Sequence, residues 1–422
     1  MIDMDDPDLQ PDTDLHTQEI LLAASQHDLT RLRHLLQSHT FPDCKSVDVQ
    51  DPETGFTPLH AAIAACEAED EGAVVNGSRP DLATSGLTET SGGQDQQKEL
   101  LVGAQETVRY LLQNGAIWNQ LDMRDETPGC IANRLGFQDL YELMVDAGVR
   151  AELLLNRLEG YEKLEGSDED EPDETECSQT NEATQSGNET RDPKSVVEPE
   201  VQINYAHYLS STLSIGADKI LDEQSNGVMM SWESGIMFQS ADALLTAPGL
   251  KVMNIGFGMG IIDTQFQSHS NRPSTHHIVE AHPAVLADMK AKGWFEKSGV
   301  VIHEGRWQDI LPKLVIEGQT FDAIYFDTYA ETYSDFRDFF SEQVMGLLDC
   351  GGRFSFFNGL GADRQISYDV YQKVLEMDLF ETGFDVDWQQ IEVPKLEEEW
   401  EGVTRRYWNI EKYRLPACRY MD

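Results

Sequence analysis

The chain carries little positive charge for its size. Its 422 residues include 31 lysines and arginines against 76 aspartates and glutamates, which gives a formal net charge of −45 at pH 7. A protein that binds nucleic acid directly normally presents a basic face, so this composition argues against that class. It fits a basic partner or substrate. The alternative is that acidic segments mainly keep the protein soluble, and both explanations can hold together.

Cysteines and long apolar runs are also scarce. No apolar run approaches the ~20 residues that a membrane helix needs. The first residues, MIDMDDPDLQPDTD, are acidic and lack the apolar region of a secretory signal. We therefore expect a soluble intracellular protein without membrane association, in the cytoplasm and with the nucleus left open as a second location. The six cysteines include no CxxC pair, which favours a reducing compartment and indicates no metal site: Cys44, Cys66, Cys130, Cys177, Cys350 and Cys418.

The length predicts two domains, and the first, residues 1–160, has the pattern of an all-α repeat domain. Thr57-Pro58-Leu59-His60 resembles the TPLHxA signature of an ankyrin repeat, in which Thr caps the helix and Pro fits its first turn. Thr127-Pro128 is typical of the start of a later repeat. The two Thr-Pro pairs lie farther apart than the ~33-residue ankyrin period. The excess falls in a polar stretch near residues 67–99, which we expect to be a loop insertion. Such a domain is either a protein-binding surface or a structural cap on its neighbour.

Residues 161–200 are expected to form an acidic disordered linker. Most of this stretch, SDEDEPDETECSQTNEATQSGNETRDPK, has almost no large apolar residue, so burial cannot offset the entropy lost on ordering it. The linker is either a passive connection or an acidic segment that attracts a basic substrate.

Residues 201–422 alternate between predicted strands and helices. A prelude before residue 248 has the pattern of helices around a turn at Asn226-Gly227. The alternation that follows predicts a doubly wound α/β domain, whose seven-stranded, mostly parallel sheet binds ligands at the carboxyl ends of its strands. Five segments predict the parallel strands and two more a final pair: VMNIGF, HHIVEA, GVVIHEG, FDAIYFDTY and GGRFSFFN, then DVDWQQIEV and TRRYWNIEKYRL.

The segment KVMNIGFGMG, residues 251–260, indicates a ligand site. An apolar strand ends there at three alternate glycines, which leave room for a nucleotide-type cofactor to approach the backbone. Glu280 ends the next predicted strand, where an acid accepts hydrogen bonds from ribose hydroxyls. Both features fit a nicotinamide dinucleotide and S-adenosylmethionine alike. The spacing GxGxG in place of GxGxxG, together with the final strand pair, favours a methyltransferase over a dehydrogenase.

Five blocks of the sequence resemble guanidinoacetate N-methyltransferase: VMMSWESGIM, IGFGMGIIDT, VEAHP, GRWQD and YFDTYAETY. With its ankyrin-like first half, the chain is most similar to the fungal protein arginine N5-methyltransferases, also called type IV arginine methyltransferases. The resemblance covers essentially the whole chain. It implies a Rossmann-like class I methyltransferase domain that uses S-adenosylmethionine.

The resemblance also implies which residues bind the cofactor. The glycine segment would hold its methionine part, the acid after the second strand its ribose, and the Arg-Trp pair after the third strand its adenine. Two residues of the prelude would close over it, with plain core packing as their alternative role. The set is Tyr208 and Met237 from the prelude, Gly256, Phe257, Gly258, Met259, Gly260 and Ile261, then Glu280, Ala281, His282, Arg306, Trp307 and Asp327.

By the same resemblance, Glu233 and Asp327 would be the catalytic pair that holds a guanidinium group. A planar guanidinium offers paired N–H donors that a carboxylate accepts bidentately. Asp327, expected at the end of the fourth strand, would keep the attacking nitrogen's lone pair available and accept its proton, while Glu233 would orient the group. The alternative roles of the two residues are a helix-surface acid for Glu233 and a strand-end cap for Asp327.

Residues beyond this pair are less well defined by the sequence. Tyr329 and Tyr333 follow Asp327 and are candidates to line a substrate channel. Ala330-Glu331 departs from the resembled small-molecule enzyme, which has a proline in this segment, so the channel shape stays open. His276 and His277 are expected to be strand residues rather than metal ligands.

We therefore expect an S-adenosylmethionine-dependent methyltransferase that acts on the δ (N5) nitrogen of arginine in a basic protein, with the choice of nitrogen implied by the resemblance alone. The ankyrin-like repeats would offer a docking surface for a partner. Three alternatives remain: a small-molecule guanidino methyltransferase, a non-catalytic ankyrin scaffold with a degenerate methyltransferase domain, and a nicotinamide-dependent dehydrogenase.

Overall fold

The computed structural model describes residues 11–42, 44–67, 91–165 and 205–421. The chain divides into two compact units, Met1–Glu152 with Gln365–Val370, and Leu153–Arg364 with Tyr371–Asp422. Of the expected linker, residues 161–200, only 161–165 are described, and they end a helix. Within the described residues, no helix is both long and apolar enough to cross a membrane.

The first unit is helical, and its short helices begin at side-chain caps. Thr57 and Thr127 each accept a hydrogen bond from a backbone N–H in the first turn and precede a proline at the first helical position. The elements are α1 (Pro11–Ser25), α2 (Leu29–Ser38), the 3₁₀ turn η1 (Ser46–Asp48), α3 (Pro58–Ala64), α4 (Ser91–Gln113), α5 (Pro128–Arg134) and α6 (Gln138–Glu165).

The expected loop insertion near residues 67–99 ends earlier than predicted. Helix α4 begins at Ser91, so residues 91–99 are helical, and residues 68–90 lie outside the described part. The segment QDQQKELL, residues 94–101, is rich in good helix formers, so the helix of the following residues begins before it.

The prelude of the second unit differs from the all-helical prediction. Between α7 (Tyr205–Ser210) and α8 (Ser234–Leu244) the chain forms a small antiparallel sheet and the 3₁₀ turn η2 (Ser231–Glu233). The turn before β3 is held by Asp222, whose carboxylate accepts the backbone N–H groups of Gln224 and Asn226. Such short strands leave no usable periodicity in the sequence. They are β1 (Ser214–Ile215), β2 (Lys219–Leu221) and β3 (Gly227–Met230).

The main sheet confirms the predicted seven-stranded, mostly parallel architecture. Its order is β6-β5-β4-β7-β8-β10-β9, with antiparallel pairing only at β10. The last strand begins at Lys412, whereas the prediction began it at residue 404, because residues 393–411 form a loop. The strands are β4 (Lys251–Ile255), β5 (Thr275–Glu280), β6 (Val300–Glu304), β7 (Phe321–Phe326), β8 (Leu348–Phe356), β9 (Phe384–Glu392) and β10 (Lys412–Tyr420).

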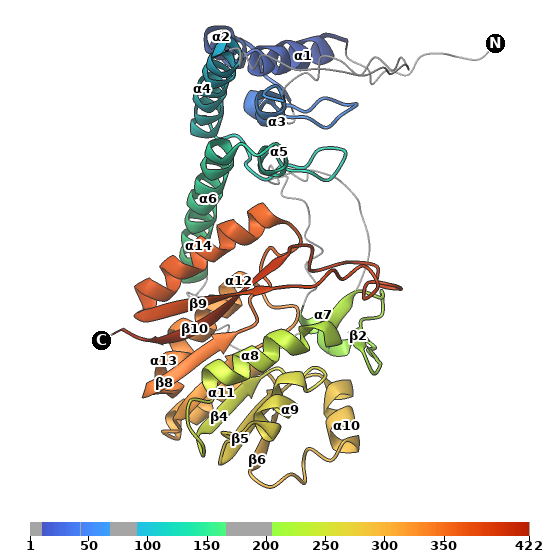
Figure 1. The fold of residues 1–422 in the computed structure, drawn as a ribbon, viewed down its shortest axis with the longest axis vertical. Coiled ribbons are helices and arrows are strands. Elements are labelled where there is room, and N and C mark those ends of the chain that lie inside the picture. The colour runs from blue at the N-terminus through green and yellow to red at the C-terminus, as the bar shows by residue number, and fades with distance from the viewer. Residues whose placement is uncertain (1–10, 43, 68–90, 166–204, 422) are drawn as a thin grey trace, which may run out of the picture. The chain divides into compact units, whose positions relative to one another are not determined.

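Helices cover both faces of this sheet (Figure 1). Alternate residues of β4 enter different cores: Met253 packs on one face with Leu311 of α11, and Val252 on the other with Ala241 of α8. Strands buried on both faces give the continuous apolar runs that the sequence showed. The helices are α9 (Ile261–Ser268), α10 (Pro283–Ala291), α11 (Trp307–Ile316), α12 (Tyr333–Asp338), the π-turn η3 (Phe339–Val344), α13 (Met345–Leu347) and α14 (Gln365–Thr382).

The chain reverses its direction of travel across the sheet at β4. Strands β5 and β6 lie on one side of β4, and the chain then returns to place β7 on the other. Ligands of open α/β sheets bind in the crevice at such a point, beyond the carboxyl ends of the strands.

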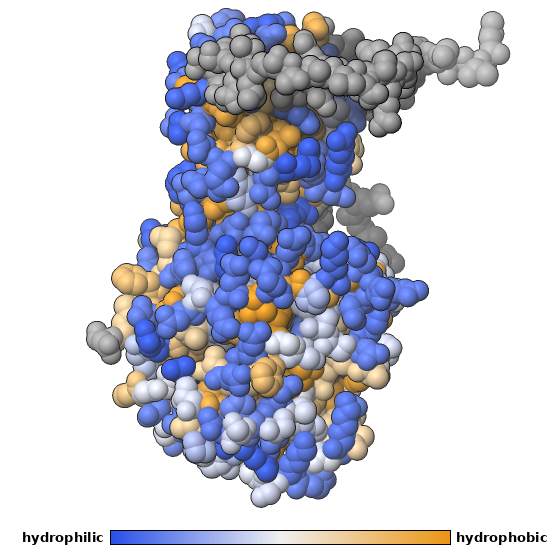
Figure 2. Space-filling view, in the orientation of Figure 1, coloured by the Kyte–Doolittle hydropathy of each residue, from blue (hydrophilic) through white to orange (hydrophobic). Residues whose placement is uncertain are grey.

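The surface in Figure 2 is mainly hydrophilic, with scattered apolar residues.

Candidate active site

The glycine segment turns sharply between β4 and α9. Gly256, Gly258 and Gly260 have φ values of 90°, 54° and 75°, in the left-handed region that favours glycine. Gly256 also has no room for a side chain, because a Cβ there would lie 1.9 Å from the carbonyl oxygen of Asp327. The N–H of Asp327 donates to the carbonyl of Ile255 at 2.9 Å. The glycine turn and Asp327 are therefore held backbone to backbone.

Glu280, at the end of β5, faces the same turn. Its carboxylate accepts the backbone N–H of Phe257 at 2.9 Å and those of Ala281 and His282 at 2.8 and 2.7 Å. Burial raises the pKa of Glu280, although these backbone donors and that of Gly258 oppose the shift. The carboxylate therefore fixes the shape of the glycine turn and places an acceptor beside it.

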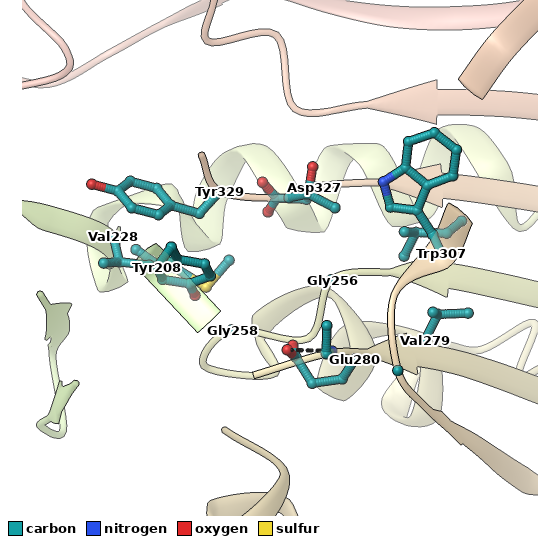
Figure 3. A pocket seen from close by; sticks show the side chains of 14 residues that line it. Tyr208, Val228, Gly256, Gly258, Val279, Glu280, Trp307, Asp327 and Tyr329 are labelled. Atoms are coloured by element: carbon teal, nitrogen blue, oxygen red, sulfur yellow. Dashed lines mark hydrogen bonds between the residues drawn. The ribbon is translucent and has the colours of Figure 1, made fainter. Parts of the chain in front are cut away.

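These elements surround a pocket of about 560 Å³, a volume that includes its open mouth. Figure 3 shows Asp327 between Tyr329 and Trp307 in this view, with Glu280 across the glycine turn from Asp327. The pocket belongs entirely to the second unit. Its wall consists of Tyr208, Val228, Met229, Ile255, Gly256, Gly258, Val279, Glu280, Ala281, Gly305, Trp307, Asp327, Thr328 and Tyr329.

About half of the sequence-predicted site residues lie in this wall. They are Tyr208, Gly256, Gly258, Glu280, Ala281, Trp307 and Asp327. The wall does not include the other predicted residues, which are Glu233, Met237, Phe257, Met259, Gly260, Ile261, His282 and Arg306.

Local packing explains where several of these other side chains lie. Met237 is fully buried in the core between α8 and the sheet, and the ring of Phe257 packs edge-on against Trp294. His282 caps α10, and its Nε2 lies 3.1 Å from the carbonyl of Tyr208. Arg306 is exposed. These residues shape the pocket from behind, except Arg306, which points its side chain to solvent.

The wall also contains residues that sequence reasoning did not select. Met229 of β3 accepts the backbone N–H of Met259 on its sulfur at 3.1 Å and so joins the small sheet to the glycine turn. Its only sequence signal was its place in the block VMMSWESGIM. Ile255 and Val279 are apolar strand ends, a position from which the wall is predictable once the strands are known.

Asp327 is partly exposed in the pocket, yet its Oδ2 is shielded from solvent and has no hydrogen-bond partner among the described residues. Burial raises the pKa of Asp327, and the nearby charge of Asp263 raises it further. A carboxylate oxygen without a donor is costly unless a ligand supplies one. The arrangement therefore favours a cationic or N–H-bearing ligand.

Glu233 is 2% exposed and ends the 3₁₀ turn η2. Its Oε1 accepts the backbone N–H of Met230 at 3.1 Å and the hydroxyl of Tyr407. Burial raises the pKa of Glu233, and the charge of Asp327 adds to the increase. The two predicted catalytic carboxylates are thus electrostatically linked. Tyr407 was missed because it lies in a loop 174 residues away.

Trp307 forms part of the pocket wall, and a hydrogen bond to Glu331 holds its indole ring in place. Its indole N–H donates to Oε1 of Glu331 at 3.0 Å, and burial raises the pKa of Glu331 to about 7. Tyr329 lines the pocket as predicted. Tyr333 is not in the wall, since its hydroxyl donates to Asp378 of α14 at 2.5 Å.

His276 and His277 are strand residues, as expected. His276 Nε2 lies 3.0 Å from Oδ1 of the buried Asp263, and His277 Nδ1 lies 3.0 Å from Nε2 of His303. Among the described residues no group of three or more His, Cys, Asp or Glu side chains is placed to hold a metal ion.

The residues of the pocket fit S-adenosylmethionine. The glycine turn lets a ligand approach the backbone, Glu280 is an acceptor where a ribose would lie, and Trp307 offers an aromatic surface. With the strand order, this defines the class as a Rossmann-like methyltransferase. A family model described as guanidinoacetate N-methyltransferase matches residues 210–417.

Curated relatives that match most of the chain are more specific. Protein arginine N-methyltransferase 2 of Aspergillus fumigatus is 56% identical over 435 residues, which cover 99% of this chain and 100% of that protein. The protein of the same name from Saccharomyces cerevisiae is 39% identical, with 77% of this chain and 80% of that protein covered. The structure of M. jannaschii TYW2 in complex with AdoMet covers 50% of this chain and 87% of its own, at 9% identity and a TM-score of 0.30. The chain belongs to the protein arginine N-methyltransferase 2 family, which bears out the expectation of a methyltransferase.

Proposed function

We propose that the protein transfers a methyl group from S-adenosylmethionine to the guanidino group of arginine in a protein substrate. The observation that carries this proposal is the pair of linked carboxylates beside the glycine turn, one of which, Asp327, has an oxygen without a donor. A guanidinium is planar, cationic and rich in N–H donors, so it satisfies both acids at once. The names of the relatives support the same substrate class.

The two acids have different tasks. When bound, S-adenosylmethionine supplies an electrophilic methyl group on a sulfonium. Asp327 lies in the pocket wall, fixed to the glycine turn through the backbone, so it is the residue to hold the attacking nitrogen and accept its proton. Glu233 neutralises the remaining charge and orients the guanidinium. Burial destabilises the ionised form of both carboxylates, and a bound cation offsets this cost. The guanidinium is therefore expected to bind best at a pH above the raised pKa values, where both acids are ionised.

The nitrogen that receives the methyl group is proposed to be the δ nitrogen. This rests on the resemblance of the whole chain to type IV enzymes, in which the ankyrin-like first half accompanies motif blocks such as WES at residues 232–234 and FDTY at 326–329. Fragmentation of the methylated peptide in a mass spectrometer distinguishes δ-methylarginine from methylation on a terminal nitrogen. Terminal methylation would contradict this part of the proposal.

The first unit is proposed to be an ankyrin-like module that docks a partner protein. Thr57 caps α3 together with His60, whose Nε2 lies 3.1 Å from the carbonyl of Glu126 just before the second Thr-Pro pair. The preceding loops also meet, since the N–H of Met123 donates to the carbonyl of Thr54 at 3.0 Å. Capped helices joined through stacked loops support a repeat architecture.

The experiment that tests the main proposal offers labelled S-adenosylmethionine with cell-extract protein or with free guanidinoacetate. Label in protein arginine is expected. Label in guanidinoacetate alone would favour the second candidate, a small-molecule guanidino methyltransferase, which the match to the guanidinoacetate family model supports. Tight cofactor binding without transfer to either would instead indicate a scaffold.

A further inference from the structure

The loop between β9 and β10, residues 393–411, is tied to the small sheet β1–β3. Lys219 of β2 donates from Nζ to the carbonyls of Glu399 at 3.2 Å and Glu401 at 2.8 Å. The backbone N–H of Thr404 donates to the carbonyl of Ser225 at 2.9 Å. In Figure 1 this loop extends from the end of β9 across to β2. It is therefore fixed beside the prelude that carries Glu233.

Aromatic packing sets the position of Tyr407 within this loop. Its ring meets Trp400 edge-on at a centroid distance of 5.0 Å and lies 6.1 Å from the ring of Trp232, the neighbour of Glu233 in the sequence. Gly227 makes room for it, because a Cβ there would lie 2.9 Å from Cε1 of Tyr407. The ring is thus held by its neighbours independently of its hydroxyl.

The two oxygens of Glu233 have unequal surroundings. Oε1 accepts both the hydroxyl of Tyr407 and the N–H of Met230, and in the described part of the chain no hydrogen bond reaches Oε2. Three titratable groups interact electrostatically with Glu233. They are Tyr325 in β7, Asp327 just after it, and Tyr407 itself. A guanidinium that reaches Glu233 therefore meets one engaged oxygen and one available oxygen.

We propose that Tyr407 is a positioning residue, whose hydroxyl keeps Oε1 of Glu233 engaged and presents Oε2 to the guanidinium of the substrate. This inference rests on the proposed function. A carboxylate with two available oxygens would accept two N–H groups in a fork. With Oε1 engaged, Glu233 accepts from one N–H, and Asp327 fixes the rest of the orientation. Burial, with the charge of Glu233, raises the pKa of Tyr407 well above its usual range, so the hydroxyl remains a donor while Glu233 titrates.

Replacement of Tyr407 by phenylalanine keeps the ring and removes only the donor. We expect Tyr407→Phe to bind ethylguanidine roughly tenfold more weakly at pH 7.5, because loss of the donor leaves less of Glu233 ionised and no longer holds its carboxylate in place. The protein is saturated with S-adenosylhomocysteine, and binding is followed by calorimetry. The pH at which ethylguanidine binding is half developed should move upward, because loss of the donor raises the pKa of Glu233. S-adenosylhomocysteine affinity should be unchanged.

Tyr420→Phe is the matched control, since the hydrogen bonds of the Tyr420 hydroxyl within the described residues go to the backbone carbonyls of Val344, Met345 and Leu348. Its ethylguanidine binding should have the same affinity and the same pH midpoint as that of the wild type. A double-mutant cycle with Glu233→Gln gives a second measurement, in which the two changes should be strongly non-additive.

Three results would contradict a role for Tyr407 or for the guanidine site. An unchanged pH midpoint in Tyr407→Phe, with S-adenosylhomocysteine binding intact, would overturn the inference. Weaker S-adenosylhomocysteine binding with the same midpoint would assign Tyr407 a purely structural role and overturn it as well. Wild-type protein that binds S-adenosylhomocysteine but not ethylguanidine would instead contradict the proposed function.

Discussion

Asp327 is the single residue on which the proposed transfer depends most directly. Its Oδ2 lacks a donor among the described residues, and its backbone is bonded to the end of β4. Asp327→Asn keeps the shape but removes the negative charge and the proton acceptor. We expect methyl transfer to fall by about 10²–10⁴-fold, with S-adenosylmethionine binding largely retained. Single-turnover transfer of labelled methyl, with a separate cofactor titration, measures both quantities.

The matched control for this change is Asp309→Asn, which alters an exposed acid in the first turn of α11. It should leave transfer unchanged. An Asp327→Asn protein with wild-type rates would remove Asp327 from the mechanism.

Glu233 makes the protein's stability depend on pH. Because burial raises its pKa in the folded state, the folded protein holds more protons than the unfolded chain above about pH 4.5, the ordinary pKa of a glutamate. Stability therefore falls as pH rises through the raised pKa. Glu233→Gln removes this loss, so the ligand-free variant should match the wild type near pH 5 and exceed it by roughly 1–3 kcal/mol near pH 8.5.

Urea unfolding at the two pH values measures this difference, and the comparison cancels histidines that titrate alike in both proteins. Glu296→Gln, a change at an exposed acid, should show no such gain. If the free energy of unfolding changes with pH in the same way in the wild type and in Glu233→Gln, burial does not raise the pKa of Glu233.

The sequence predicted which strand ends form the site better than it predicted which side chains point into it. Glu280 ends a strand and Asp327 follows one, and the carboxyl ends of parallel strands meet, so their place in the pocket was predictable from the sequence. Arg306 and Trp307 are adjacent, yet only Trp307 lies in the wall, because the start of α11 turns the two side chains apart. Tyr407 reaches Glu233 through a loop whose path depends on tertiary contacts, and no local pattern predicts such a path.

At the scale of elements, the connection between β4 and β7 is set by the glycine turn. Gly256→Ala would place a methyl group 1.9 Å from the carbonyl oxygen of Asp327, at a φ of 90°. Gly249→Ala is a close control, with a φ of 81° and no atom within 4 Å of the added Cβ. We expect the control to lose about 1–2 kcal/mol through backbone strain alone. Gly256→Ala should lose several kcal/mol more, because the strand ends must move apart.

Urea unfolding and S-adenosylmethionine titration of both variants test this expectation. Cofactor binding should disappear in Gly256→Ala and persist in Gly249→Ala. Equal losses of stability in the two variants would mean that the turn tolerates a side chain at residue 256 and that its backbone contact with Asp327 is not closely packed.

The sequence predicted all seven strands of the main sheet, including β6 and β9, which are only partly buried. Strands β4, β5 and β7 are buried along nearly their whole length, and their helices follow at short spacing. Strands β1 to β3 contain two to four residues each, too few for any period to be visible. Their structure depends on the local Asp222 turn and on the tertiary contact between Met229 and the glycine turn.

At the scale of the whole molecule, we expect the net charge of −45 to favour the approach of a basic substrate. A strongly negative protein attracts basic proteins over distances comparable with the Debye length, about 10 Å at 0.1 M salt. The same field acts weakly on a small cation such as ethylguanidine, whose binding depends on the local contacts of Glu233 and Asp327. Long-range attraction and local recognition are therefore separable by salt.

We expect KM for a basic arginine-containing protein substrate to rise several-fold between 50 and 300 mM NaCl, while kcat changes little, because screening weakens encounter and not the buried carboxylates. Ethylguanidine binding is the internal control and should vary much less over the same range. Initial rates with labelled S-adenosylmethionine, at saturating donor, give both constants. A KM independent of salt would mean that the acidic composition serves solubility alone, and that the substrate is selected by contacts close to Asp327.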